Sequence, residues 1–413
     1  MGKPADEQDR KRFSGMSLPY RLAILSTHPI QYHTPWFRGL AAHPDLRIHV
    51  YYCHKATPQE QASAGFGIAF DWDVPLLEGY PHSFLENVAN PASHGRFAGF
   101  DTPEIGSIIR ERQYDAVLVN GWNHKSAWQA IWAAWSADVK VFVRGDSHLH
   151  TPRSLPVKIA KSLAYPRFMS RYDACLAAGR WSREYFEHYG ARPDRIFFVP
   201  HTVDMNCSDD KLLLRSDMRK RFSLQEDVVA FLFVGKFIAE KRPLDFLYGL
   251  RQAWLQGARV LGLMVGDGPL RPDCEEFVRS TEIPVTFAGF LNQSRIVDAY
   301  LAADVLVLPS ERETWGLVVN EAMACGCPCI VSDRVGCGPD LVIPEVTGVV
   351  SPYGNVPALS AAINRLAQSP SQIAVMGANA RERLRQYSVR AAVEGVLEAF
   401  AATKIAMEPA CTH

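Results

Sequence analysis

Short apolar runs alternate with longer helix-like stretches along almost the whole chain, and this alternation restricts the fold more than any other feature. The runs are rich in β-branched residues, and a helical pattern follows most of them. Such alternation predicts parallel strands that helices cover on both faces. The runs fall into two series: residues 21–26, 48–52, 116–119, 139–143, 174–178 and 196–199, and then residues 228–234, 260–265, 285–287, 305–308 and 328–331.

A polar segment between the two series, residues 204–227, indicates a boundary between domains. Boundaries fall in exposed, polar stretches of this kind, and a chain of 413 residues has room for two cores. We expect two Rossmann-like, doubly wound α/β domains that face a central cleft and close about a hinge near residues 202–208. The expected divisions are a disordered tail at 1–18, a first domain at 19–204, a second at 205–380, and a C-terminal helix within 381–413 that packs back on the first domain.

Composition narrows the class of function. Lys+Arg and Asp+Glu both number 44, so the formal net charge is zero, which argues against a nucleic-acid binder that works through bulk charge. The chain has no run of 18 apolar residues, so we expect no transmembrane helix. The first 20 residues are charged and lack the apolar core of a secretory signal.

The nine cysteines are odd in number, and their spacings suit no disulfide framework, which favours a reducing cytoplasm. Cys325, Cys327 and Cys329 alternate into a strand-like run and lack the C-x₂-C spacing of structural zinc sites. We therefore expect them to be small buried apolar residues rather than metal ligands.

Two carboxylates, Glu313 and Glu321, belong to a strand–loop–helix unit. Residues 305–308 read as a buried strand, and residues 317–324 lack Pro and Gly and stop shortly before Gly326, as a helix does. Glu313 then lies in the loop after the strand, and Glu321 lies in the helix. Because ligands bind at the carboxyl ends of strands in open α/β sheets, the pair predicts a site for the hydroxyls of a sugar and a ribose.

Glycines and cations follow the first two strands of the second series. Gly235, Lys236 and Lys241 come after the first strand, and Gly266 and Gly268 after the next. Glycine lets a ligand approach the backbone closely, and two cations near a helix N-terminus suit a diphosphate. Each signal alone also fits a solvated loop or a simple turn. Their shared position at successive strand ends favours one common site.

Phe290 and Leu291 follow the third strand of this series, where they could cover a nucleotide base. With these motifs, residues 234–350 resemble the donor-binding half of the family 4 retaining glycosyltransferases, which have the GT-B fold. The matching motifs are Gly235-Lys236 with Glu240-Lys241, Gly266-Asp-Gly268, Phe287-Ala-Gly289, Glu313 through Glu321, and Ile330-Val-Ser-Asp333.

The resemblance implies a role for each residue of the donor site. Glu313 would contact hydroxyls of the donor sugar, and Glu321 would accept hydrogen bonds from the ribose. Lys236 and Lys241 would neutralise the diphosphate leaving group, while the backbone amides of Gly316 and Leu317 would face the phosphates or the sugar. The family usually carries Arg at position 236, and Lys keeps the charge without the bidentate fork. Two cations can stabilise the developing charge, so we expect no metal and no cofactor beyond the donor.

Polar residues of the first domain are candidates for the acceptor side. His28 and His33 follow the first strand, and Arg144 and Asp146 follow the fourth. His124 lies about four residues beyond the place where relatives present a cleft histidine, and we assign it a catalytic role. The alternatives are local hydrogen bonding for the histidines and a structural salt bridge for Arg144 and Asp146.

Residues 153–171 form a basic, amphipathic segment. It could dock an anionic acceptor or the membrane surface, and a solvated helix face is the alternative. Pro166 is expected to kink or end this helix.

The sequence thus predicts a retaining, metal-independent glycosyltransferase that moves a sugar from a nucleotide diphosphate sugar to a saccharide or lipid-linked saccharide. UDP-sugar is the donor that the resemblance implies, and the base, sugar and acceptor cannot be read from the residues. We expect it in the cytoplasm or on the inner face of the membrane, in the synthesis of cell-surface polysaccharide or glycoconjugate. Two alternatives are a sugar-nucleotide epimerase or hydrolase of the same fold, which normally lacks the glutamate pair, and a non-catalytic nucleotide-sugar-binding protein.

Overall fold

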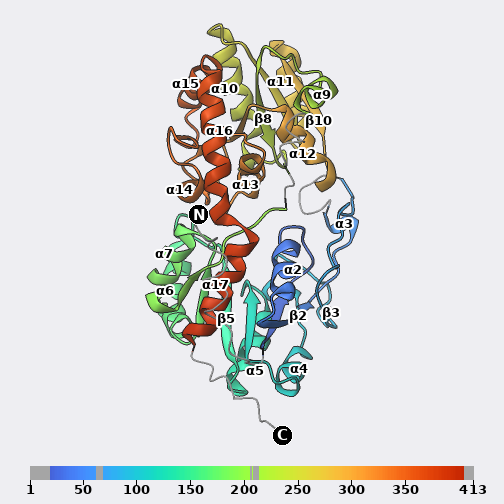
Figure 1. Cartoon of the computed structure of the whole chain (residues 1–413), viewed down its shortest axis with the longest axis vertical. Helices are drawn as coiled ribbons and strands as arrows, with labels where there is room; N and C mark the ends of the chain where they lie inside the picture. Colours follow the sequence, from blue (N-terminus) through green and yellow to red (C-terminus); the bar gives the residue numbers. More distant parts are fainter. Residues whose placement is uncertain (1–18, 62–67, 205–206, 208–213, 404–413) are drawn as a thin grey trace, which may run out of the picture.

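Two parallel sheets, one in each half of the molecule, form the framework of the computed structural model, which describes residues 19–61, 68–204, 207 and 214–403 (Figure 1). The first sheet has seven strands in the order β3-β2-β1-β4-β5-β6-β7, and the second has six in the order β10-β9-β8-β11-β12-β13. All strand pairs of both sheets are parallel. The predicted fold class, two doubly wound α/β domains, is confirmed. The tail at 1–18 and most of the segment 205–213 lie outside the described residues.

The first domain contains all six strands that the sequence predicts and one more, β3, whose three partly exposed residues show no apolar run. Its strands are β1 (Tyr20–Ser26), β2 (Leu46–Tyr52), β3 (His82–Phe84), β4 (Ala116–Asn120), β5 (Lys140–Gly145), β6 (Ala174–Ala177) and β7 (Ile196–Phe198). Its helices are α2 (Thr34–Ala42), α3 (Pro58–Gln61), α4 (Ile105–Glu111), α5 (Lys125–Ser136), α6 (Leu155–Met169) and α7 (Arg180–His188), with 3₁₀ turns η3 (Phe97–Gly99) and η4 (Pro193–Arg195).

The second domain contains the five predicted strands and a further edge strand, β13. Its strands are β8 (Val229–Val234), β9 (Val260–Val265), β10 (Val285–Gly289), β11 (Val305–Leu308), β12 (Cys329–Ser332) and β13 (Gly348–Ser351). Its helices are α9 (Arg215–Arg221), α10 (Pro243–Leu255), α11 (Arg271–Thr281), α12 (Gln293–Ala302), α13 (Leu317–Ala324), α14 (Gly338–Leu341), α15 (Val356–Ala367) and α16 (Pro370–Leu384), with the 3₁₀ turn η5 (Ala239–Lys241). The predicted helix at 317–324 has the predicted bounds.

The central strands are buried along their whole length. All six residues of β8 and all six of β9 are buried, with no alternation of exposed and buried positions. This is the pattern of a parallel sheet that helices cover on both faces. The carboxyl ends of these strands are therefore the places where their loops can present polar side chains.

The last helix, α17 (Val389–Ala402), leaves the second domain and packs on the first. Figure 1 shows it as the red helix that continues from α16, after the 3₁₀ turn η6 (Arg385–Tyr387), down along the lower domain. Ala392, Val396 and Phe400 join the core formed by α2 and the first sheet. The ring of Phe400 stacks on Tyr20 with 4.4 Å between ring centroids. The chain thus crosses between the domains twice.

Two expectations from the sequence are wrong. Cys207 and Cys325 form a disulfide across 118 residues of sequence, a pairing that no local spacing could show, whereas Cys327 and Cys329 are buried free thiols as expected. The second concerns one of the two outcomes expected at Pro166: α6 does not end there and runs on to Met169. Pro166 is exposed, so water can reach the carbonyl group that the proline leaves without its helical partner. Within the described residues no helix is both long and apolar enough to span a bilayer.

Candidate functional site

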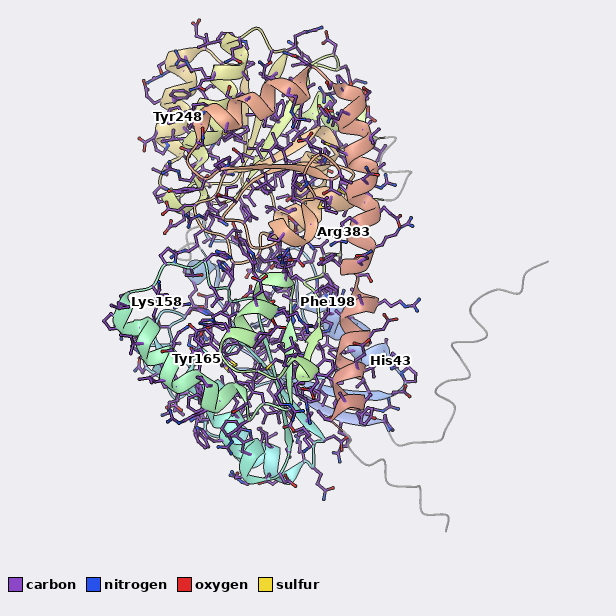
Figure 2. The ribbon with its side chains drawn as sticks, turned by 90° about the vertical axis from the view of Figure 1, so that its left-hand side faces the viewer. His43, Lys158, Tyr165, Phe198, Tyr248 and Arg383 are labelled. Atoms are coloured by element: carbon purple, nitrogen blue, oxygen red, sulfur yellow. A yellow bond between two sulfur atoms is a disulfide. The ribbon has the colours of Figure 1, made fainter. Side chains whose placement is uncertain are left out.

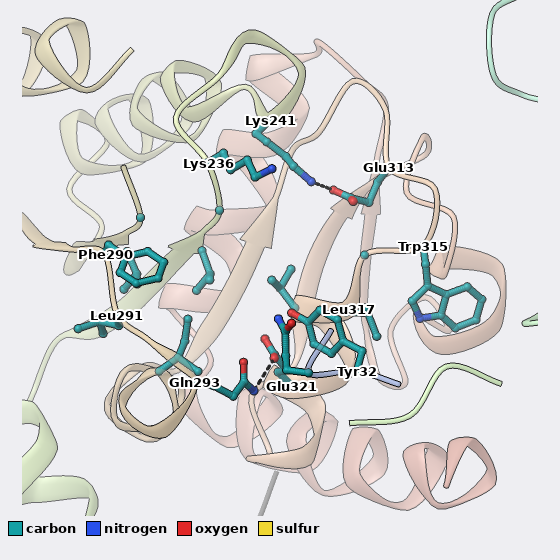
Figure 3. Close-up of a pocket in the computed structure, with 18 of the residues that line it drawn as sticks. Tyr32, Lys236, Lys241, Phe290, Leu291, Gln293, Glu313, Trp315, Leu317 and Glu321 are labelled. Atoms are coloured by element: carbon teal, nitrogen blue, oxygen red, sulfur yellow. Dashed lines mark hydrogen bonds and ion pairs between the residues drawn. The ribbon is translucent and has the colours of Figure 1, made fainter. Parts of the chain in front are cut away.

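A cavity of about 390 Å³ lies between the two domains, at the carboxyl ends of the strands (Figure 3). The loops that follow β8, β9, β10 and β11 form one wall. The first domain supplies Gln31, Tyr32, Trp72, Asp146 and His201 to the other. Eleven of the residues predicted from the sequence line it: Asp146, Gly235, Lys236, Lys241, Gly266, Phe290, Leu291, Glu313, Gly316, Leu317 and Glu321.

Positive charge gathers at one end of the cavity, next to Glu313. Lys241, at the end of the turn η5, forms an ion pair with the Glu313 carboxylate (Figure 3). Burial and the charge of Lys241 lower the pKa of Lys236, and Glu313 works in the opposite direction. Two ammonium groups and one carboxylate thus share a partly desolvated space. An anionic ligand here would meet a net positive charge.

Two glycines bring the backbone to this end of the cavity. Gly266 follows β9 with φ of +130°, and a Cβ atom there would lie 1.9 Å from the carbonyl oxygen of Gly235. Gly316 has φ of +100° and occupies the N-cap of α13. The first N–H groups of a helix have no partner within the helix, and the N-terminus carries a partial positive charge. Leu317 and Val318, in the first turn of α13, line the cavity, so this end is suited to phosphate oxygens.

The other end of the cavity carries a buried carboxylate, Glu321. Tyr300 donates a hydrogen bond to its Oε2 at 2.6 Å, and the Gln293 side chain donates one to Oε1 at 3.3 Å. Burial raises the pKa of Glu321, while hydrogen bonds from Tyr300, Gln293 and Tyr32 oppose that rise. Figure 3 shows Tyr32, Gln293 and Glu321 together, away from the Lys241 pair. The carboxylate is therefore held in one orientation as an acceptor.

A loop of the first domain reaches across to the second domain beside Phe290. Asn292 donates to the backbone oxygen of Asp71 at 2.7 Å, and the backbone N–H of Ser294 donates to Asp73 at 3.0 Å. The rings of Phe70 and Phe290 lie 4.4 Å apart. This loop brings Trp72 to the cavity. Trp72 was not predicted from the sequence, because its loop belongs to neither a strand nor a glycine motif.

Arg144 and Asp146 have different environments, although they are neighbours after β5. Asp146 lines the cavity, 3.4 Å from His201 Nε2. Burial disfavours its charge, but His201 and Arg144 outweigh burial and lower its pKa. Arg144 is buried beneath the cavity wall, where its guanidinium donates to the backbone oxygens of Val199 and Pro200 at 3.4 and 3.2 Å. Burial lowers its pKa to about 10. Arg144 therefore fixes the segment that follows β7.

The predicted histidines and Gly268 are not among the residues that line the cavity. Asn120 lies 3.1 Å from the ring of His33, whose pKa burial lowers strongly. His28 and His124 belong to a separate group around His94: His28 lies 4.6 Å and His124 6.3 Å from the His94 ring. Burial and neighbouring histidines lower the pKa of His28 to about 4.

Comparisons with known proteins give one consistent result. The family model described as "Glycosyl transferases group 1" matches residues 215–383, and that described as "Glycosyl transferase 4-like domain" matches residues 79–202. A D-inositol 3-phosphate glycosyltransferase of Kineococcus radiotolerans is 30% identical over 53% of this chain and 54% of its own length. One from Rhodococcus jostii is 26% identical over 93% of this chain and 89% of its own length. A sulfoquinovosyl transferase of Arabidopsis thaliana is 36% identical over 43% of this chain and 34% of its own length.

Solved structures share the architecture at lower identity. Anabaena HepE in complex with UDP and glucose superposes with a TM-score of 0.67 at 18% identity, over 92% of this chain and 99% of that chain. A glycosyltransferase of Rickettsia africae gives a TM-score of 0.71 at 15% identity, over 94% and 99%.

These likenesses and the two facing sheets define a protein of the GT-B fold. Together with the two family models, which cover both domains, they place the chain in a particular group: it belongs to the family 4 glycosyltransferases.

Proposed function

We propose that this glycosyltransferase is a retaining, metal-independent enzyme that takes its sugar from a UDP-sugar and transfers it to a saccharide or lipid-linked saccharide. One observation carries the proposal: a single cavity has two lysines and a helix N-terminus at one end and a fixed carboxylate at the other. The positive end of the cavity thus suits the diphosphate of a nucleotide sugar, and the carboxylate at the other end suits the hydroxyls of its ribose.

The placement of the donor follows from these groups. The diphosphate lies against Lys236, Lys241 and the first turn of α13, and Glu321 accepts hydrogen bonds from the ribose. The base lies near Phe290 and Leu291. Glu313 then faces the sugar. UDP as the nucleotide is supported by Anabaena HepE, whose structure holds UDP and glucose.

The chemistry required of the protein is charge stabilisation. Transfer breaks the bond between the anomeric carbon and the diphosphate oxygen, and the diphosphate leaves with the electron pair. An acceptor hydroxyl oxygen forms the new bond, and its proton passes to an oxygen of the departing diphosphate. Lys236, Lys241 and the helix amides stabilise the charge that grows on the leaving group, and such preorganised groups act mainly in the transition state. These cations perform the role that a divalent metal fills in other enzymes. Retention rests on the family alone.

A role in making cell-surface polysaccharide or glycoconjugate, in the cytoplasm or at the inner face of the membrane, is part of the proposal. It is supported by relatives that are named for glycosyl transfer with different substrates, the two D-inositol 3-phosphate glycosyltransferases and the sulfoquinovosyl transferase.

The first test is a thermal-shift screen of UDP, GDP, ADP and their sugars. A ligand at 100 times its Kd adds about 2.7 kcal/mol to the free energy of unfolding, so the true nucleotide should raise Tm visibly. UDP and UDP-sugars are expected to give the largest shift. Absence of any shift with all three nucleotides would overturn the proposed site.

Product analysis then separates the rival functions. Wild-type protein incubated with the donor and an acceptor panel is expected to give a glycosylated product of unchanged anomeric configuration, at the same rate with and without EDTA. Epimerised or hydrolysed donor without transfer would favour an epimerase or hydrolase. Tight nucleotide binding without turnover would favour a binding protein.

A further inference from the structure

A second cavity, of about 370 Å³, lies in the first domain between the loop after β5 and helices α6 and α7. None of the described residues that line it is a carboxylate. The lining residues are His148, Leu149, Thr151, Arg153, Lys158, Ile159, Ser162, Tyr185, His188 and Tyr189. A wall of basic, hydroxyl and phenol groups without acids has the chemistry that binds anions.

The cations of this cavity have no acidic partners. In the part of the chain that the structure describes, neither Arg153 nor Lys158 forms an ion pair, whereas Arg180 and Arg183 of the neighbouring helix α7 each pair with a glutamate. Burial and neighbouring tyrosines raise the pKa of Tyr185 and Tyr189, and the positive charge of Arg153 nearby acts in the opposite direction. Lys158 lies at the end of α6 nearest the second domain (Figure 2).

His148 lies between this cavity and the donor cavity. Its side chain is only 3% exposed, and neither ring nitrogen makes a hydrogen bond of good geometry to a described residue. Burial and His150 lower its pKa, while the backbone of Glu313 and the charge of Asp146 act in the opposite direction. Since Glu313 and Asp146 both line the donor cavity, His148 stands between the two spaces. A ligand held by Arg153 and Lys158 would therefore lie near the Glu313 end of the donor cavity, on the other side of His148.

Helix α6 also presents an apolar stripe beside the same cavity. Leu155, Ile159 and Leu163 recur every four residues, which places them on one face, and they are 68%, 51% and 64% exposed. Ile159 belongs to both the stripe and the cavity lining. The cavity and the stripe together therefore suit two kinds of ligand: a small anion, and an anionic group at the end of an apolar chain.

We propose that this second cavity is an acceptor subsite that binds a phosphate group, either of a small phosphorylated acceptor or of a lipid headgroup. The inference rests on the proposed function, because it assigns the substrate class of the same transfer. Arg153 and Lys158 bind the phosphate, and Thr151 and the tyrosine hydroxyls complete its hydrogen bonds. His148 lies on the side of the acceptor that carries the reacting hydroxyl.

The test compares a double charge reversal, Arg153→Glu with Lys158→Glu, with a control, Arg167→Glu, at an exposed position of α6 that does not line the cavity. Glycerol 3-phosphate and glycerol serve as the small probes, and the broadening of the ³¹P resonance reports phosphate binding. Wild type and the control are expected to broaden the resonance of glycerol 3-phosphate. In the double variant this broadening is expected to be smaller by a factor of about five or more. The UDP thermal shift should be the same in all three proteins.

A second arm identifies the source of the phosphate. Co-sedimentation with phosphatidylcholine vesicles, with and without phosphatidylglycerol, is measured for the same variants. Binding of glycerol 3-phosphate supports a small acceptor, and phosphatidylglycerol-dependent sedimentation that only the double variant loses supports a headgroup. Equal losses in the double variant and in Arg167→Glu, or no binding of either probe by wild type, would overturn the subsite. A wild type that lacks the UDP shift but binds glycerol 3-phosphate would instead contradict the donor site alone.

Discussion

The two edges of the cleft differ in how their polar residues are arranged. In the second domain, loops after four strands bring their motif residues into one cavity. In the first domain, the candidate residues separate into distinct groups: His28 and His124 around His94, His33 beside Asn120, and Asp146 with His201 at the cavity.

Glycine-bounded turns in the second domain account for part of the difference. The loop after β8 is short and turns at a glycine, and Gly266 holds the next loop against it, so the side chains have few alternative directions. The first domain instead sends long segments from its strand ends, such as residues 68–76, which contact the other domain. A short loop bounded by glycines sets the positions of its own side chains. The side chains of a long loop are positioned by contacts with other parts of the fold.

Replacing Glu313 by Ala should have the largest effect. The change removes the acid that faces the sugar and leaves Lys241 without its partner. Loss of one preorganised group of this kind costs about 100-fold or more in kcat. The loss is measured as the transfer rate with the identified donor and acceptor. The control is Glu311→Ala, which changes an exposed acid of the same loop. Wild-type rates in Glu313→Ala would contradict the donor assignment.

Replacing Lys236 or Lys241 by Ala should have the next largest effect, a fall in kcat of about 10- to 100-fold. Each change removes a positive charge that stabilises the leaving group. Lys236→Arg should retain most of the activity, because it keeps the charge. Steady-state kinetics measure the loss, and Lys220→Ala, on the exposed surface of α9, is the matched control. If all three Ala variants behaved alike, the cationic end would have no role in transfer.

Much of the donor side was predictable because its signals are local. The bounds of α13, the glycines at the strand ends and the two glutamates follow from spacing along the chain, and the cavity unites them. The partners of Glu321 were not predictable, since Tyr300 lies one helix away and Tyr32 lies in the other domain. His201, Trp72 and the Cys207 disulfide depend on contacts between distant segments. No periodicity encodes them.

Replacing Glu321 by Gln should weaken UDP binding by roughly tenfold and change the pH dependence of stability. Burial raises the pKa of this carboxyl above 4.5 in the folded protein. Its contribution to stability is therefore fully present below the unfolded-state value and is lost as pH rises through the higher folded-state pKa. Since Gln does not ionise, the Tm difference between variant and wild type should increase in favour of the variant from pH 4 toward pH 8. Thermal unfolding across this range measures the difference, and a constant offset would contradict the shift.

Replacing His124 by Ala should have the smallest effect, below about tenfold in kcat, with unchanged UDP binding. The structure places this side chain near His94 and the backbone oxygen of Arg96, outside the donor cavity. A general base contributes about 100-fold or more. A loss of that size, with a changed pH–rate profile, would restore the catalytic role that the sequence suggested and would show that the first domain's histidines do converge when an acceptor is present.

The course of α17 determines how this protein can be divided. Its apolar face completes the core under Phe37 and Tyr20, although the gene encodes it after the whole of the second domain. A fragment that stops at residue 204 would expose that core, and a premature stop before residue 389 would damage the domain whose own sequence is intact. The two halves are thus not independent pieces that can be exchanged between relatives at the linker. A chimaera that is meant to carry a foreign donor domain must keep the native last helix with the native first domain.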